Sequence, residues 1–181
     1  MSRIGITQAD VLIRHRNTAD IPASAQILRQ VYDSDGYPVE GVADPLSWLE
    51  PAALIQAWVA EVASEVVGHV AIFEAQEGDP AVTLWQAQSG ETGTVAVLGR
   101  LFVLSTARGM SIGELLVRTC MKDADRRGIQ LLLDVMAKDQ DAIRLYERLG
   151  WRRLGPSTHA FGAGESTAAY CYAAPPPGSE V

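Results

Sequence analysis

The sequence has few of the residues that mark disulfide-rich, metal-binding or nucleic-acid-binding proteins. Its 181 residues include two cysteines, Cys120 and Cys171, too few for a disulfide framework and outside any Cys/His cluster with zinc-ligand spacing. We expect both to be buried as small hydrophobic side chains, and we expect no metal. No run of lysine and arginine occurs, and the formal net charge is −7, which argues against a nucleic acid as partner.

Long apolar runs are also missing. No stretch approaches the length of a membrane span, and the first residues lack the apolar segment of a signal peptide. We therefore expect a cytoplasmic protein with no membrane partner. Hydrophobic residues make up 48% of the chain and charged residues 20%, an ordinary globular balance. This predicts a single domain over residues 1–174, followed by a disordered, proline-rich tail over residues 175–181.

The most informative stretch runs from Val95 to Gly113. Residues 95–103 have the apolar character of a strand, residues 105–111 form a turn of mostly small residues, and from Ile112 to about Arg127 the spacing is helical. The first amides of a helix lack partners within it, and the helix dipole places positive charge there. With Arg108 and the adaptable backbone at Gly109 and Gly113, this turn is predicted to bind a phosphate or pyrophosphate.

A structural interpretation of the same turn competes with this one. Ser111 and Glu114 have the spacing of a capping box, which would satisfy the same amides without a ligand. The stretch contains neither the Gly-Lys-Ser/Thr of a P-loop nor the Gly-x-Gly-x-x-Gly of a dinucleotide fold. Taken alone, the turn leaves both interpretations open.

A second motif downstream decides between them. The segment Ala-Ile-Arg-Leu-Tyr-Glu-Arg-Leu-Gly-Trp over residues 142–151, together with Arg-x-x-x-x-Gly at Arg108–Gly113, resembles the GNAT superfamily of N-acetyltransferases. Ser111 stands where the family motif has its first glycine. The resemblance implies an α/β (α+β) fold in which helices flank a central mixed, mostly antiparallel sheet. It also implies acetyl-CoA as co-substrate.

The resemblance further implies a role for individual residues. Tyr146 takes the position of the general acid that protonates the coenzyme A sulfur, although it could also be a core aromatic residue of an amphipathic helix. Asp134 takes the position of a glutamate base, and Asp139 that of a coenzyme-binding asparagine. The implied cofactor-binding set is Phe102 and Val103 through their backbone, Arg108, Gly109, Met110, Ser111, Ile112, Gly113 and Asp139.

The general base has several candidates. Asp134 lies in the apolar run of residues 130–136, so its carboxylate must face a cleft or have partners. An aspartate reaches less far than a glutamate, which leaves a water relay open, with His159, Glu61 and His69 as alternative bases. His69 is more simply interpreted as a satisfied sheet residue.

The rest of the chain supplies the other elements of the predicted fold. Strands are expected at residues 11–14, 58–62, 66–73, 130–136, from 151 and at 167–173, and further helices at residues 20–32 and 140–149. Residues 33–51 are predicted to form a long loop with at most one helical turn, in which Tyr37 contacts the acceptor and Trp48 anchors the loop. Residues 156–165 are predicted to be a loop that brings His159 to the acceptor. The segment 74–94 is predicted to be a surface insertion that packs through Trp85 or touches a partner subunit in a homodimer.

Together these features predict an N-acetyltransferase that moves an acetyl group from acetyl-CoA to a primary amine by direct attack. The acceptor would be a small molecule or a protein N-terminus. The alternative is a non-catalytic acyl-CoA-binding regulatory domain of the same fold, which Ser111 and the absence of a glutamate base would allow. A longer acyl group than acetyl is also open at this stage.

Overall fold

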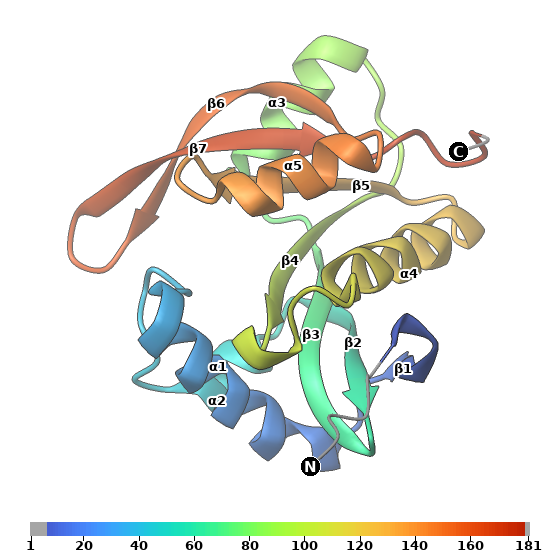
Figure 1. Cartoon of the computed structure of the whole chain (residues 1–181). Coiled ribbons are helices and arrows are strands. Elements are labelled where there is room, and N and C mark those ends of the chain that lie inside the picture. Colours follow the sequence, from blue (N-terminus) through green and yellow to red (C-terminus); the bar gives the residue numbers. More distant parts are fainter. Residues whose placement is uncertain (1–6, 180–181) are drawn as a thin grey trace. The chain divides into compact units, whose positions relative to one another are not determined.

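A computed structural model describes residues 7–179 of the chain, and its strands form one mixed sheet (Figure 1). The seven strands follow the order β1-β2-β3-β4-β5-β7-β6. β1 pairs with β2 and β7 pairs with both β5 and β6 in antiparallel fashion, whereas β4 and β5 are parallel. The predicted fold class, a mostly antiparallel sheet flanked by helices, is confirmed. The elements are β1 (Val11–His15), α1 (Ile21–Asp35), α2 (Pro45–Leu49), β2 (Leu54–Val62), β3 (Glu65–Glu74), α3 (Pro80–Ser89), β4 (Val95–Val103), α4 (Ile112–Arg126), β5 (Gln130–Met136), α5 (Gln140–Arg148), β6 (Arg152–Phe161) and β7 (Glu165–Ala173).

The described chain divides into two compact units. The first comprises residues 7–52, 56–71 and 100–117, and the second comprises residues 53–55, 72–99 and 118–179. β3, β4 and α4 each contribute residues to both units.

The core of the first unit forms around α1. Its buried residues recur every three or four positions, the period of one helix face: Ile21, Ser24, Ala25, Ile27, Leu28 and Val31. The apolar members pack with Leu49 of α2 and Phe102 of β4, and Tyr37, Trp48 and Val66 pack against this cluster. α1 ends at Gly36, whose φ of 68° is the left-handed conformation that glycine adopts readily at a helix C-terminus. The loop 33–51 therefore contains the last turn of α1 and the short helix α2.

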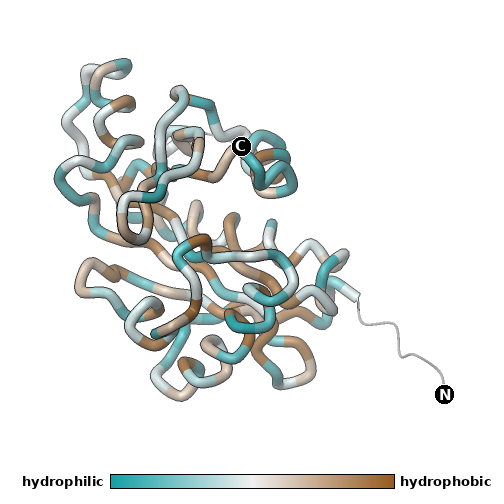
Figure 2. The backbone as a smooth tube through the Cα atoms, turned by 90° about the vertical axis from the view of Figure 1, so that its left-hand side faces the viewer, coloured by the Kyte–Doolittle hydropathy of each residue, from teal (hydrophilic) through white to brown (hydrophobic). Residues whose placement is uncertain are grey.

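In the second unit, α3 covers one face of the β5–β7–β6 sheet and α5 covers the other (Figure 1). On the α3 face, Trp85 packs with Leu132, Leu154 and Cys171. On the α5 face, the ring of Tyr146 lies 6.5 Å from that of Tyr172. Hydrophobic and hydrophilic stretches alternate along the backbone (Figure 2).

Two segments differ from the sequence prediction. Residues 80–89, predicted to be part of a surface insertion, form helix α3, although Trp85 packs as predicted. Residues 156–161, predicted to be part of a loop, extend β6, so only a three-residue turn separates it from β7. Pro156 is tolerated there because β6 is the edge strand of the sheet, where one missing backbone donor costs little.

The end of the described chain makes specific contacts. The backbone N–H of Ala174 donates to the carbonyl of Leu131 over 2.9 Å. The N–H of Gly178 donates to the Asp125 carboxylate. Both cysteines are buried with free thiols, as predicted. Within residues 7–179, no helix is both long and apolar enough to span a membrane.

Candidate active site

The predicted anion-binding turn links β4 to α4 in the first unit. A short 3-10 turn, Ser105–Ala107, is followed by Arg108, Gly109 and Ser111, which are exposed, before α4 begins at Ile112. Gly109 has a φ of 85°, a left-handed conformation that explains a glycine at this position. The turn therefore presents exposed backbone and one arginine directly before the N-terminus of a long helix. The side chains of Phe102 and Ile112 are buried, so these two residues offer only their backbone to a ligand.

Ser111 is held in a conformation that suits glycine better. Its φ is 57°, whereas a capping-box serine has an extended backbone. In a residue with a Cβ atom, left-handed backbone geometry costs about 1–2 kcal/mol of conformational energy, because Cβ lies too close to the following carbonyl oxygen. The departure from the family motif is therefore also a point of backbone strain.

We expect Ser111→Gly to raise the free energy of unfolding by about 0.5–1 kcal/mol, because relief of the strain exceeds the added freedom of the unfolded chain. The melting temperature would rise by about 1–4 °C, measured by thermal denaturation. Ser105→Gly, in the preceding 3-10 turn, is the matched control and should lower it. A lower melting temperature for Ser111→Gly would show that the serine side chain stabilises the turn.

Arg108 is paired within the first unit. Its guanidinium donates to the carboxylate of Asp35, the last residue of α1. This contact also lowers the pKa of Asp35 below its ordinary value. The Arg108 side chain is 48% exposed and that of Asp35 33% exposed, so water screens the pair and an incoming anion can compete for the arginine.

The long loop packs onto β4 through aromatic rings. Trp48 lies with its ring centroid 6.1 Å from that of Tyr37 and 6.2 Å from that of Phe102. The Arg100 guanidinium lies 4.6 Å above the Trp48 ring, and its Nε donates to the Trp48 carbonyl over 2.6 Å. Trp48 is thus an anchor, as its sequence context indicated. Tyr37 is half-buried beside it.

His69 is buried in the first unit and has hydrogen-bond partners on both ring nitrogens. Nδ1 lies 2.9 Å from the carbonyl oxygen of Arg100, and Nε2 lies 3.1 Å from Nη1 of Arg16. The ring stacks on Phe102 with centroids 5.0 Å apart. Burial lowers the pKa of His69 to about 3, and the positive charges of Arg16 and Arg100 act in the same direction. This supports the interpretation of His69 as a neutral structural residue.

Tyr146 lies on the inner face of α5 in the second unit. It is 5% exposed, and its ring centroid lies 5.4 Å from that of Trp151, which follows the helix. Burial raises the pKa of Tyr146 above its ordinary value, and the charges of Asp134 and Asp139 contribute to the shift. The phenol therefore stays protonated at neutral pH, as a general acid requires.

The structure brings Asp134 and His159 together. Asp134 lies on β5 and His159 on β6, and the Asp134 Oδ2 atom is 3.2 Å from His159 Nδ1. Their side chains are 32% and 25% exposed, respectively. The expectation that the Asp134 carboxylate needs a partner or a cleft is confirmed. His159 reaches it from a strand rather than from the predicted loop.

The strand register places this pair and Tyr146 on opposite faces of the second unit's sheet. Asp134 is opposite Cys171, which packs with α3, whereas the preceding residue of β5 is opposite Tyr172, which packs with Tyr146. Successive residues of a strand point to opposite faces. Asp139 is half-buried at the start of α5, where its side chain makes no capping hydrogen bond.

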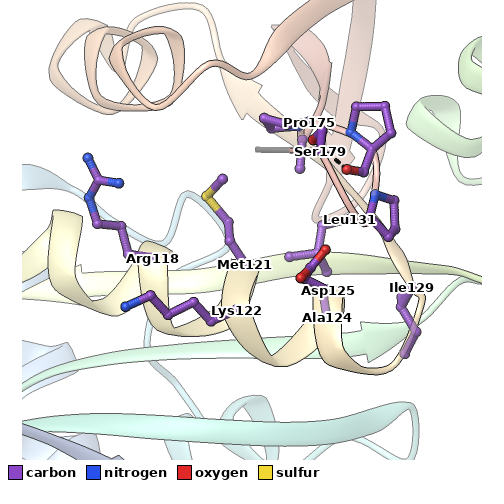
Figure 3. A pocket seen from close by; sticks show the side chains of 12 residues that line it. Arg118, Met121, Lys122, Ala124, Asp125, Ile129, Leu131, Pro175 and Ser179 are labelled. Carbon is purple, nitrogen blue, oxygen red and sulfur yellow. Dashed lines mark hydrogen bonds between the residues drawn. The ribbon is translucent and has the colours of Figure 1, made fainter. Parts of the chain in front are cut away.

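A cavity of about 240 Å³ opens elsewhere in the second unit. It is lined by the second half of α4, the start of β5 and the prolines after β7, with Arg118 and Lys122 at one end and Pro175 and Ser179 at the other (Figure 3). None of the described residues that the sequence analysis predicts to be catalytic, cofactor-binding or acceptor-binding lines this cavity. This cavity could not be predicted from the sequence, because part of its lining comes from residues 175–179, the segment expected to be a tail.

The model of the acetyltransferase (GNAT) family matches residues 24–151. The chain belongs to the GNAT acetyltransferase family. This match covers most of the chain and includes both motifs that carried the resemblance, and membership supports an acyltransferase activity. No curated protein sequence matches the chain.

Solved structures of GNAT enzymes share its fold. The ribosomal-protein-S18-alanine N-acetyltransferase from Escherichia coli is 16% identical, with a TM-score of 0.68 over 94% of this chain and 96% of that one. The ribosomal-protein-alanine N-acetyltransferase from Brucella melitensis is 24% identical, with a TM-score of 0.67 over 90% of this chain and 98% of that one. Arabidopsis thaliana NAA60 in complex with acetyl-CoA is 19% identical, with a TM-score of 0.67 over 90% of this chain and 98% of that one. At these identities the likeness shows the fold alone.

Proposed function

We propose that this GNAT protein is an N-acetyltransferase that transfers the acetyl group of acetyl-CoA to a primary amine. The observation that carries the proposal is the turn Arg108–Gly113, which presents exposed backbone and a solvent-accessible arginine before the N-terminus of α4. A helix N-terminus and a guanidinium both favour the pyrophosphate of a coenzyme A thioester. Solved relatives with acetyl-CoA bound support the same co-substrate.

In the proposed reaction the amine first gives up a proton, because only its neutral form has the electron pair for attack. Its nitrogen then bonds to the thioester carbon, and the carbon–sulfur bond breaks with its electron pair passing to sulfur. Tyr146 donates its hydroxyl proton to that sulfur, and the proton still carried by the new amide nitrogen restores the phenol. The products are the acetylated amine, coenzyme A with a free thiol, and one released proton.

The acceptor is proposed to be a small-molecule amine or a protein N-terminus. Two structural neighbours are named as alanine N-acetyltransferases of ribosomal proteins. The amine of an alanine residue is its α-amino group, which is free at a protein N-terminus, so these neighbours favour the N-terminus. The long loop that carries Tyr37 suits a small molecule, and the net charge of −7 favours a cationic acceptor of either kind. We further propose that the protein is cytoplasmic.

The test is a thermal-shift titration with acetyl-CoA, with coenzyme A and ATP as comparisons, followed by a screen of amines for thiol release. At one hundred times the dissociation constant, acetyl-CoA should stabilise the protein by about 2.7 kcal/mol, a rise of about 5–10 °C. A rise with acetyl-CoA and none with ATP would support the co-substrate. No rise with acetyl-CoA would overturn the assignment of the turn. Binding without turnover of any amine would favour the non-catalytic alternative.

The Arg108–Asp35 pair allows a direct test of whether Arg108 contacts the co-substrate. We expect Asp35→Asn to lower the dissociation constant for acetyl-CoA about two- to fivefold, because an exposed ion pair that competes for Arg108 is worth up to about 1 kcal/mol. Asp33→Asn removes an exposed carboxylate two residues earlier on α1 and is the matched control. Equal affinities in both variants would mean that Arg108 does not contact the ligand.

A further inference from the structure

The cavity beside α4 is lined by residues outside the proposed acetyl-transfer site, and all of them lie in the second unit. Its volume of about 240 Å³ is that of about eight water molecules in the liquid. Protein interiors are packed so densely that voids of this size are few. The side chains around the cavity show why it stays open.

Two features of the walls prevent side chains from filling the cavity. Met121 is a flexible residue of the kind that fills gaps in a core, but its sulfur is held by Trp151, whose indole N–H donates to Sδ over 3.4 Å. Ala124 on α4 and Ala174 after β7 line the cavity with methyl groups alone. The walls are therefore either tethered or short.

The far end of the cavity is formed by residues 175–179. This segment begins with three consecutive prolines, whose rings fix φ. It is fastened on both sides of the prolines, because the N–H of Ala174 donates to the Leu131 carbonyl over 2.9 Å and the N–H of Gly178 donates to the Asp125 carboxylate. A stiff segment that is held in this way lines the cavity without collapsing into it.

The charged groups of the cavity lie along one face of α4. Arg118, Met121, Lys122 and Asp125 are spaced by three or four residues, so they share that face. Arg118 and Lys122 lie at the end away from the prolines (Figure 3). Two cationic groups and one carboxylate leave an excess of one positive charge, and the Asp125 carboxylate already accepts the N–H of Gly178. The cavity thus suits a ligand with a single negative charge at one end.

We propose that this cavity is a binding site for a small monocarboxylic acid with an aliphatic chain. The carboxylate pairs with Lys122, and the chain lies against the aliphatic side chains of Met121, Leu131 and Pro175. The cavity is smaller than the roughly 300–1,000 Å³ of pockets for drug-sized ligands, which limits the ligand to about ten non-hydrogen atoms. Binding here does not depend on the proposed acetyl transfer, because the turn Arg108–Gly113 and Tyr146 do not line the cavity.

Isothermal titration calorimetry with octanoate, an acid of this size, tests the site, with octanol and acetate as comparisons. Octanoate should bind the wild-type protein about three- to tenfold more tightly than octanol, which lacks the charge. Acetate lacks the chain and should not bind. Lys122→Gln should weaken binding of octanoate about three- to tenfold and leave binding of octanol unchanged. Lys138→Gln replaces the other lysine of the chain, which is exposed outside the cavity, and should bind both ligands as the wild type does.

A measurement on the wild-type protein locates the bound acid. In protein with isotope-labelled methionine methyl groups, the signal that is missing from the spectrum of Met121→Leu identifies Met121. Octanoate should shift this signal until it saturates and leave the signal of Met110, in the first unit, in place. Ala174→Leu fills the cavity and should abolish binding of both octanoate and octanol. The proposal is overturned by the absence of binding at millimolar octanoate, by a shift confined to other methionines, or by equal affinities of the wild type for octanoate and octanol.

Discussion

Replacing Tyr146 by phenylalanine is expected to lower kcat about 100- to 1000-fold, because the thiolate then leaves without its proton donor. The KM for acetyl-CoA should change little, since the removed hydroxyl acts on the leaving sulfur rather than on binding of the co-substrate. The ring contacts with Trp151 and Tyr172 remain in the variant, so its stability should be close to that of the wild type. Thiol release measured at saturating acetyl-CoA checks the prediction.

Tyr32→Phe is the matched control, because Tyr32 is an exposed tyrosine on α1 outside the proposed site. Wild-type turnover in Tyr146→Phe would mean that water or another group protonates the sulfur, and Tyr146 would then be a core residue of α5. A parallel rise in the KM for acetyl-CoA would indicate that the hydroxyl contributes to binding instead.

The second large effect concerns stability in acid and has its origin in His69. The pKa of His69 is lowered to about 3 by burial, whereas an unfolded histidine titrates near pH 6.5. Between these values the unfolded state binds one more proton than the folded state, so the free energy of unfolding falls as the pH falls. The loss is about 1.4 kcal/mol for each pH unit below 6.5, or about 2 kcal/mol at pH 5.

Urea denaturation between pH 7 and pH 4.5 measures this loss directly. His69→Gln removes the titrating ring, so its stability should fall less steeply with pH than that of the wild type, although it is less stable at pH 7. His15→Gln keeps His69 and should reproduce the wild-type slope. Identical slopes for wild type and His69→Gln would show that water reaches the ring and that its protonation is tolerated.

Most elements could be predicted from the sequence because their signals are local. The apolar runs of β4 and β5, the helical period from Ile112 and the glycine after α5 each depend on neighbours along the chain. α3 could not be predicted because its hydrophobic residues do not line one face of a helix, and its burial depends on packing of Trp85 against β5 and β7. No periodicity within residues 74–94 reveals that packing.

The candidate base illustrates the same limit within the site. The apolar context of Asp134 predicts that its carboxylate needs a partner or a cleft. Which residue is the partner depends on the pairing of β5, β7 and β6. β6 resembles a loop in sequence because it contains Gly155 and Pro156, and its half-buried positions include serine and histidine rather than aliphatic residues. Small and polar residues at every second position were the only sequence signal for a strand in this part of β6, and such a pattern is weak when the strand register is not known. The left-handed backbone of Ser111 likewise has no counterpart in the sequence beyond the glycine that the family motif expects there.

The way in which the two compact units share the chain constrains how the protein can be synthesised and dissected. The first unit needs residues 100–117 to complete it, and the second unit begins with residues 53–55 and 72–99. Neither unit is a continuous segment, so no single cut of the chain yields either one whole. During translation, the first unit cannot be completed before the ribosome has released residue 117, by which time part of the second unit has already emerged. Truncated fragments of this acetyltransferase should therefore leave hydrophobic core positions unfilled, which favours study of the full-length chain.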